Sequence, residues 1–182
     1  MTSDPWETGV LDPAVHGRLV QDRQYYAELA GVPEEWLWEP LSAHVGEEEL
    51  QWVRSYPKLH KKGVSGICYQ GASGRELMRR MQALTGALCR NFVDARLRMV
   101  EDVVGESLSG LKTCSTLLIP NLYLGFEKPF PSVKAEVGSL LFTRAGADRQ
   151  TVLYIKDYDE FEEVYGATIR NHVESTYLGL TI

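Results

Sequence analysis

The sequence predicts an α/β fold with a five-stranded, mainly parallel sheet that is covered by helices on both faces. Short, nearly continuous apolar runs recur along the chain, as strands buried on both faces require. Longer stretches between them carry apolar residues at helical spacing, and this alternation implies right-handed crossovers between parallel strands. Helical patterns also precede the first strand, so the sheet follows an N-terminal helical segment.

The N-terminal helices are predicted from their start and stop residues. Asp12 and Pro13 supply an N-cap and a first-turn proline, and Gly31 can end the helix that they begin. A second helix is expected to start near Gly46 and to end before Pro57. We divide the chain into an N-terminal helix and linker, residues 1–45, and an α/β domain, residues 46–182.

The strands and helices of the domain follow in order. The predicted strands are Gly66–Gln70, Arg90–Val93, Thr116–Pro120, Thr151–Lys156 and Thr176–Thr181. A stripe of apolar residues from Leu77 to Leu88 predicts the helix after the first strand. The later helices are expected to begin at Asp94 as an N-cap, at Pro131, and at Asp159 as an N-cap.

Composition and charge exclude several classes of protein. The net charge of −6 argues against coating nucleic acid through bulk positive charge. No apolar run approaches the roughly 20 residues of a membrane-spanning helix, and residues 1–10 lack the pattern of a secretion signal. The three cysteines, in apolar surroundings, suit reduced thiols, and no cysteine or histidine spacing predicts a metal site. We therefore expect a cytoplasmic protein without a membrane or metal site.

The loop after the first predicted strand lies where parallel sheets bind ligands, at the strand carboxyl end. Its candidate phosphate-binding residues are Gly71, Ser73, Gly74, Arg75 and Glu76. A working phosphate loop needs Lys for the phosphates and Ser or Thr for Mg²⁺. Arg75 and Glu76 stand at those two positions, and Tyr69 stands where the first glycine belongs. The alternative is an ordinary tight turn between a strand and a helix.

The end of the third predicted strand also lacks the acidic residues of a working ATPase. In ATPases that carry a phosphate-binding loop, acidic residues at this position hold Mg²⁺ and orient the attacking water. Pro120 and Asn121 take their place, and Asn121 is at best a neutral metal ligand. With both positions changed, we expect no catalytic residues, and ATP with Mg²⁺ is disfavoured as a cofactor.

With the loop and the third strand aligned in this way, the chain resembles the AAA+ ATPase domain of the DnaC/IstB group. This group comprises helicase loaders and transposition helper ATPases. The segments that carry the resemblance are Gly31–Trp36, Leu59–Tyr69, Leu117–Leu122, Leu140–Arg144, Gln150–Ile155 and Phe161–Val173. The resemblance implies a sheet of the P-loop NTPase type. It also places Arg170 at the family's arginine that reaches a neighbour's nucleotide. Because the printed chain ends after the fifth strand, we expect the family's C-terminal helical lid to be lacking.

Two surfaces are candidates for contact with partners. Arg54, Lys58, Lys61 and Lys62 form a basic cluster that could contact nucleic-acid phosphates, or that simply places cations at a helix C-terminus. Trp36 and Trp38 could anchor a partner protein or belong to the core.

Three functions remain open from the sequence. The first is a catalytically inactive, ATPase-like adaptor or scaffold in a DNA-processing complex, with a helicase or transposase as partner. The second is an atypical nucleotide- or phosphate-binding enzyme with Arg75 and Lys156 as charge clamps, for which Glu76, Asp94 and Asp157 are the nearby candidate bases. The third is an assembly subunit without any ligand.

Overall fold

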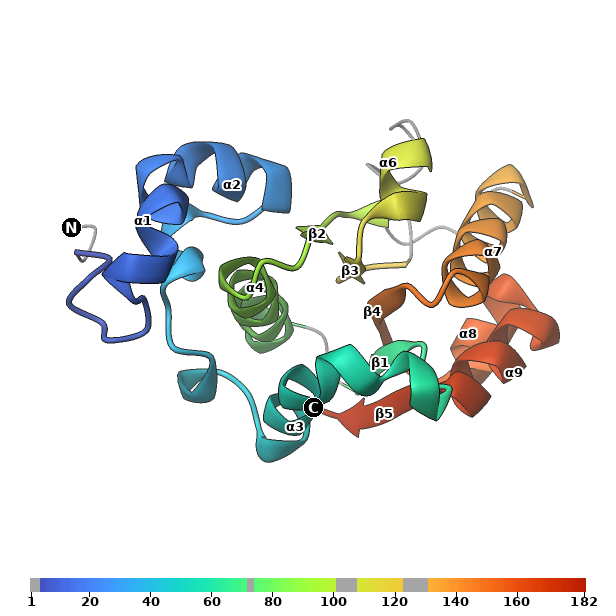
Figure 1. The fold of residues 1–182 in the computed structure, drawn as a ribbon. Helices are drawn as coiled ribbons and strands as arrows, with labels where there is room; N and C mark the ends of the chain where they lie inside the picture. The colour runs from blue at the N-terminus through green and yellow to red at the C-terminus, as the bar shows by residue number, and fades with distance from the viewer. Residues whose placement is uncertain (1–3, 72–73, 101–107, 123–130) are drawn as a thin grey trace.

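The computed structural model describes residues 4–71, 74–100, 108–122 and 131–182. Its strands are β1 Gly66–Gln70, β2 Ala95–Leu97, β3 Thr116–Ile119, β4 Gln150–Ile155 and β5 Tyr177–Thr181. They form one five-stranded sheet in the order β2-β3-β4-β1-β5, and every pair is parallel (Figure 1). The predicted α/β fold with the strand order of P-loop NTPases is confirmed, and the sheet is parallel throughout.

Helices precede the sheet and connect its strands. They are α1 Pro13–Gln21, α2 Arg23–Ala30, α3 Glu47–Ser55, α4 Arg75–Arg90, α6 Leu108–Thr113, α7 Pro131–Gly146, α8 Tyr158–Tyr165 and α9 Ala167–Thr176. Short 3₁₀ turns cover Glu34–Leu37, Leu41–Ala43, Tyr56–Lys58 and His60–Lys62. Within the described ranges, none of these helices is long and apolar enough to cross a membrane.

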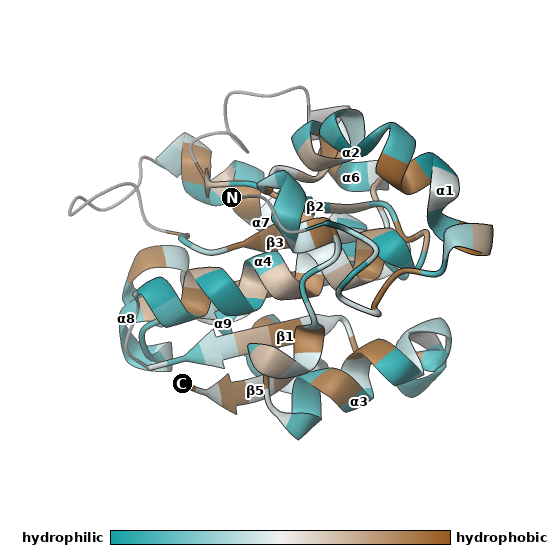
Figure 2. Ribbon diagram, turned by 90° about the vertical axis from the view of Figure 1, so that its left-hand side faces the viewer, coloured by the Kyte–Doolittle hydropathy of each residue, from teal (hydrophilic) through white to brown (hydrophobic). Residues whose placement is uncertain are grey.

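The sheet separates two hydrophobic cores, one on each face. Figure 1 shows α4 on one side, with α1 and α2 outside it, and α7, α8 and α9 on the other. Ile67 and Tyr69 of β1 belong to the core with α1–α4, whereas Cys68 between them belongs to the core with α6–α9. This alternation is what a pleated strand buried on both faces produces. Figure 2 accordingly shows hydrophobic residues along β1, β3 and β5.

The predicted start and stop residues of the N-terminal helices are confirmed. The Asp12 carboxylate accepts a hydrogen bond from the Ala14 N–H at 2.9 Å, and Gly31 ends α2 with φ of +73°. The single helix expected between them is two helices, because the backbone leaves helical geometry at Asp22. At the next helix the Gly46 N–H donates to the Glu49 carboxylate at 2.9 Å, and α3 ends at Ser55.

The predicted second strand, Arg90–Val93, is wrong. Helix α4 continues through Arg90, and its last turn is closed by hydrogen bonds from the Phe92 N–H to the Cys89 carbonyl and from the Val93 N–H to the Leu88 carbonyl. Phe92 adopts φ of +60°, which is the left-handed conformation of a helix C-terminus and not of a strand. The second strand is instead β2.

Two predicted N-caps are also corrected. Asp94 does not start a helix but precedes β2, where its carboxylate accepts hydrogen bonds from Arg96 at 3.0 and 3.1 Å. Asp157, and not Asp159, caps α8 by accepting a hydrogen bond from the Glu160 N–H at 2.7 Å. Pro131 does begin α7 as expected.

Candidate functional site

The candidate loop leaves the carboxyl end of β1, beside the end of β4. The Gly71 N–H donates to the Lys156 carbonyl at 3.1 Å, and the Tyr154 hydroxyl donates to the Gly71 carbonyl at 2.7 Å. A Cβ atom at Gly71, whose φ is +116°, would lie 2.4 Å from the Ile182 carbonyl oxygen. Both backbone groups of Gly71 therefore have partners within the chain, and close packing alone requires a glycine here.

The start of α4 is the open part of the site. Gly74 is the N-cap of α4, and no atom lies within 4 Å of the position that a Cβ would occupy. Arg75 is exposed and makes no ion pair with the described residues. Ser73, the remaining loop candidate, lies outside the described residues. An anion at this helix start would meet the positive end of the helix dipole and the Arg75 guanidinium.

Glu76 is turned away from the loop, along α4. Its carboxylate accepts a hydrogen bond from Arg80 at 2.8 Å, one helical turn later, and its side chain is 74% exposed. Arg80 also donates to Glu49 of α3 at 2.7 Å. Burial opposes the charge of Arg80, but the hydrogen bonds that Arg80 donates to Glu76 and Glu49 outweigh this effect and raise the pKa of Arg80. Glu76 thus belongs to a charge network with Arg80 and Glu49.

The same network explains Tyr69, which stands at the position of the first loop glycine. Its side chain is fully buried, and its hydroxyl donates to the Glu49 carboxylate at 3.1 Å. Burial raises the pKa of Tyr69, and the nearby Glu49 carboxylate raises it further. Tyr69 therefore anchors β1 to α3.

The ends of β3 and β4 complete the edge of the site. Asn121 is partly exposed and has an interaction partner within the chain, while the neighbouring Leu122 carbonyl accepts a hydrogen bond from Tyr165 of α8. The Lys156 ammonium group forms an ion pair with Glu160 at 2.9 Å, and this hydrogen bond raises the pKa of Lys156. Among the described residues, no cluster of three or more His, Cys, Asp or Glu side chains could hold a metal ion.

Arg170 lies on α9 and is occupied by its neighbours. It forms ion pairs with Glu174 at 3.1 Å and with Glu162 at 3.6 Å, and its guanidinium group lies 5.6 Å from the centre of the Tyr158 ring. Its side chain is 27% exposed. Reaching a neighbouring subunit would require Arg170 to leave these partners.

The two tryptophans differ. Trp38 is only 2% exposed and belongs to the core, which is one of the two interpretations that the sequence left open. Trp36 is partly exposed and packs edge-on against His44, with the ring centres 5.0 Å apart. A partner-binding role in this linker therefore rests on Trp36 alone.

The basic cluster lies away from the loop, because the segment from α3 to β1 enters the sheet at the amino end of β1. Lys58, Lys61 and Lys62 are exposed, and Arg54 forms an ion pair with Glu47 at 2.9 Å. A shallow pocket of about 330 Å³ is lined by Lys62 together with acidic residues of α3. Acidic neighbours reduce the attraction of this surface for phosphate.

The site therefore combines predicted and unpredicted residues. The structure brings the β1–α4 loop beside Lys156, as the parallel sheet requires, but places the basic cluster at the opposite, amino end of β1. The contacts of Glu49 and Arg80 were not predicted from the sequence. Their available signals were the spacing of Glu49 from the helix start at Gly46, and the i, i+4 spacing of Glu76 and Arg80.

Comparison with known proteins supports the fold. No protein-family model and no curated protein matches the chain. A structure of DnaI matches with a TM-score of 0.61 and 17% identity, over 83% of this chain and 94% of that one. A DNA replication initiation factor matches with a TM-score of 0.57 and 15% identity, over 76% of this chain and 47% of that one.

A third structure, the replication initiator DnaA bound to AMPPCP and single-stranded DNA, matches with a TM-score of 0.55 and 17% identity. The match covers 78% of this chain and 49% of DnaA, so the chain spans about half the length of DnaA and of the initiation factor. At these identities the likeness concerns the fold. The chain is similar in fold to the structures of DnaI, of the replication initiator DnaA and of the DNA replication initiation factor.

Proposed function

We propose that this chain is a non-hydrolysing, ATPase-like adaptor or scaffold of a DNA-processing complex, of the helicase-loader or transposition-helper type. The similarity to DnaI, over most of both chains, supports the loader type. The proposed loss of hydrolysis rests on the identity of two residues at the start of α4, Arg75 and Glu76. Arg75 replaces the compact ammonium group of the loop lysine, and Glu76 pairs with Arg80 where a hydroxyl should bind Mg²⁺.

The enzyme alternative finds less support, because its candidate bases have other partners. Glu76 pairs with Arg80, both oxygens of Asp94 accept from Arg96, and Asp157 caps α8. These hydrogen bonds occupy the oxygens with which a general base would have to reach its substrate's proton. The third possibility, an assembly subunit without any ligand, differs from the adaptor in its partner and not in its chemistry.

Hydrolysis is tested with the purified chain, Mg²⁺ and ATP, by measuring released phosphate. We expect no hydrolysis above the protein-free blank, and no difference between the wild type and Arg75→Ala. Hydrolysis that Arg75→Ala abolishes would disprove the proposal. Arg23→Ala serves as the matched control, since Arg23 is also on a surface helix but lies in α2, away from the loop.

The partner is tested by affinity purification from the native host followed by mass spectrometry. Recovery of a helicase, a transposase or another DNA-processing subunit is expected with the wild type, and its loss with Trp36→Ala. Trp6→Ala is the matched control because Trp6 is 37% exposed and lies before α1. A monomer that brings down no DNA-processing subunit would contradict the adaptor.

A nucleic-acid role for the basic cluster is a separate part of the proposal. The exposed Lys58, Lys61 and Lys62 would bind DNA through phosphates, without sequence preference and with strong salt dependence. The test compares single-stranded DNA binding at low salt between the wild type and the triple change to Gln. Equal binding by both proteins would exclude this role.

A further inference from the structure

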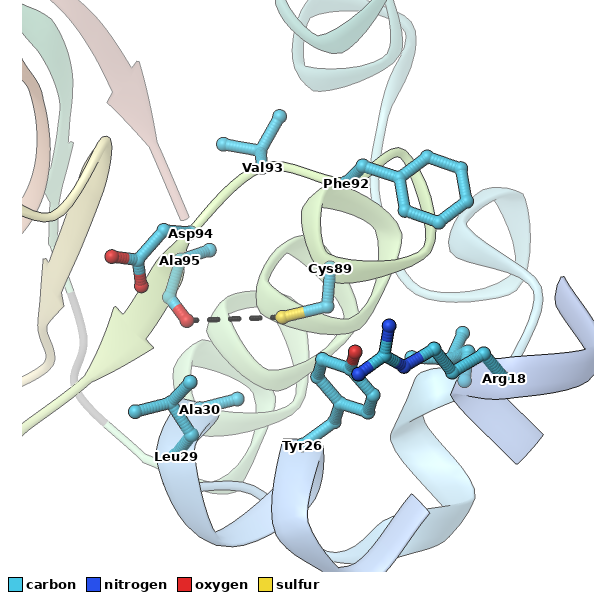
Figure 3. A pocket seen from close by; sticks show the side chains of 10 residues that line it. Arg18, Tyr26, Leu29, Ala30, Cys89, Phe92, Val93, Asp94 and Ala95 are labelled. Atoms are coloured by element: carbon cyan, nitrogen blue, oxygen red, sulfur yellow. Dashed lines mark hydrogen bonds between the residues drawn. The ribbon is translucent and has the colours of Figure 1, made fainter. Parts of the chain in front are cut away.

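A pocket of about 430 Å³ lies between the N-terminal helix pair and the far end of α4. It is formed by α1 and α2, the last turn of α4 and the chain that leads into β2 (Figure 3). Its volume falls in the range of small-molecule sites, about 300–1,000 Å³. Helix α4 is 16 residues long, so its two ends are about 24 Å apart. The pocket is therefore separate from the loop at the start of α4.

The wall of the pocket is mainly hydrocarbon. Leu19, Ala30 and Ala95 are buried in it, with exposed fractions of 4%, 1% and 2%. Leu29 and Val93 are partly exposed and extend the apolar surface toward the opening. Such a wall favours an apolar body over a strongly hydrated one.

The rim at the end of α4 has a fixed geometry. Phe92 holds φ of +60°, where glycine is the usual residue, and its ring remains 69% exposed. The ring stacks on His16 of α1, with the planes 5° apart, and His16 Nε2 lies 3.0 Å from the Arg90 carbonyl. These contacts tie α1 to the end of α4, so the pocket is preformed.

The two ends of the pocket carry different polar groups. At one end the Asp94 carboxylate is neutralised by Arg96, which binds both of its oxygens. At the other end lie Arg18 and Tyr26 (Figure 3). The Arg18 side chain is 85% exposed, and its ion pair with Asp22 is long, at 3.6 Å. The Tyr26 hydroxyl makes no hydrogen bond within the described ranges, so both groups are available to an acceptor.

We propose that this pocket binds a small aromatic acid, whose ring lies against the apolar wall and whose carboxylate or sulfonate meets Arg18 and the Tyr26 hydroxyl. A neutral ring of the same shape gains the apolar contacts without the charge-assisted hydrogen bond. An aromatic cation gains no partner, because the Asp94 carboxylate is already occupied. The pocket thus favours an acid over a neutral or cationic compound with the same ring.

The experiment uses naphthalene-2-carboxylate as the probe and naphthalene-2-carboxamide as its neutral counterpart. Each is titrated into the full ¹⁵N-labelled chain, and the amide shifts are followed by NMR. We expect saturable shifts in α1, α2 and residues 89–95, with the acid binding about tenfold tighter than the amide. The Arg18→Gln and Tyr26→Phe variants should weaken binding of the acid more than binding of the amide, whose neutral carbonyl accepts weaker hydrogen bonds.

The matched controls are Arg23→Gln and Tyr25→Phe. Both residues lie in the same helix pair but line a different, polar pocket, and both variants should bind the acid as the wild type does. Val93→Trp should block both probes, because the indole would fill the pocket. Absence of saturable shifts in the wild type, equal binding of acid and amide, or shifts centred outside these segments would each overturn the proposal.

Discussion

The hydroxyl of Tyr69 donates a hydrogen bond to the buried carboxylate of Glu49 at 3.1 Å, and this bond ties the central strand β1 to α3. Arg80 reaches the same carboxylate from α4 at 2.7 Å. Three elements around the β1–α4 loop are thus joined through one side chain. The side chain of Tyr69, at the carboxyl end of β1, is therefore committed to a contact within the fold.

Removing Glu49 should destabilise the fold more than removing the Tyr69 hydroxyl. Tyr69→Phe should cost about 1 kcal/mol, because Glu49 keeps its bonds to Arg80 and to the Gly46 N–H. Glu49→Leu should cost about 2–3 kcal/mol, because it leaves the buried Tyr69 hydroxyl without a partner. Urea unfolding measures both. The exposed Glu48 provides the control, since Glu48→Leu should change stability by less than about 0.5 kcal/mol.

Gly71→Ala should destabilise the chain by about 1–3 kcal/mol. The alanine Cβ would lie 2.4 Å from the Ile182 carbonyl oxygen, and the φ of +116° disfavours any side chain. Gly17→Ala should have the opposite sign, about 0.5–1 kcal/mol of stabilisation, because Gly17 lies inside α1 with no atom within 4 Å of its Cβ position. Thermal unfolding of both variants decides the matter, and a neutral Gly71→Ala would refute the close packing at the loop.

Stability should decrease on acidification partly through His172. Its Nε2 atom is buried without a hydrogen-bond partner in the described structure, and burial lowers the pKa of His172 in the folded state. The unfolded chain therefore binds the proton more readily, so the contribution of His172 is full above the unfolded pKa of about 6.5 and is lost as pH falls toward the lower folded pKa. Urea unfolding at pH 7.5 and 5.5 should show a smaller loss for His172→Phe than for the wild type. Equal losses would show that His172 does not contribute.

The cysteine thiols should react slowly in the native protein. Burial raises the pKa of Cys89 to about 11 and that of Cys68 to about 12. Two pKa units above the ordinary value reduce the thiolate fraction, and hence alkylation at neutral pH, by about 100-fold. Intact mass spectrometry after iodoacetamide treatment should show slow labelling of the native chain and rapid labelling in urea. Rapid labelling of Cys68 or Cys89 without urea would contradict the burial.

Much of the fold could be predicted because its signals are local. Asp12, Gly31 and Pro131 act through the conformation of their own segments, and the apolar run of β1 is readable without its neighbours. The position of β2 could not be predicted because this strand lacks such a local signal. That strand has only three residues, and its position depends on pairing with β3 and not on a pattern of its own. The preceding residues follow the helix because the Val93 N–H reaches the Leu88 carbonyl.

The sequence by itself determined which side chains stand in the β1–α4 loop, because the identity of a residue at a motif position can be read directly from the sequence. Only the tertiary structure decided what those side chains contact. Glu49 lies 20 residues before Tyr69 and 31 before Arg80, and such distant pairs leave no periodic trace in the sequence.

Arg144 shows the same limit within the core. As a cation in the last turn of α7 it matches a common surface pattern, yet it is fully buried and donates to the carbonyls of Leu111, Cys114 and Gln150. Those carbonyls come from separate segments that meet only when α6, β3 and β4 pack together. The local conformation of a segment depends on residues that are neighbours in the sequence. The hydrogen bonds of a buried charge depend instead on groups that only folding brings together.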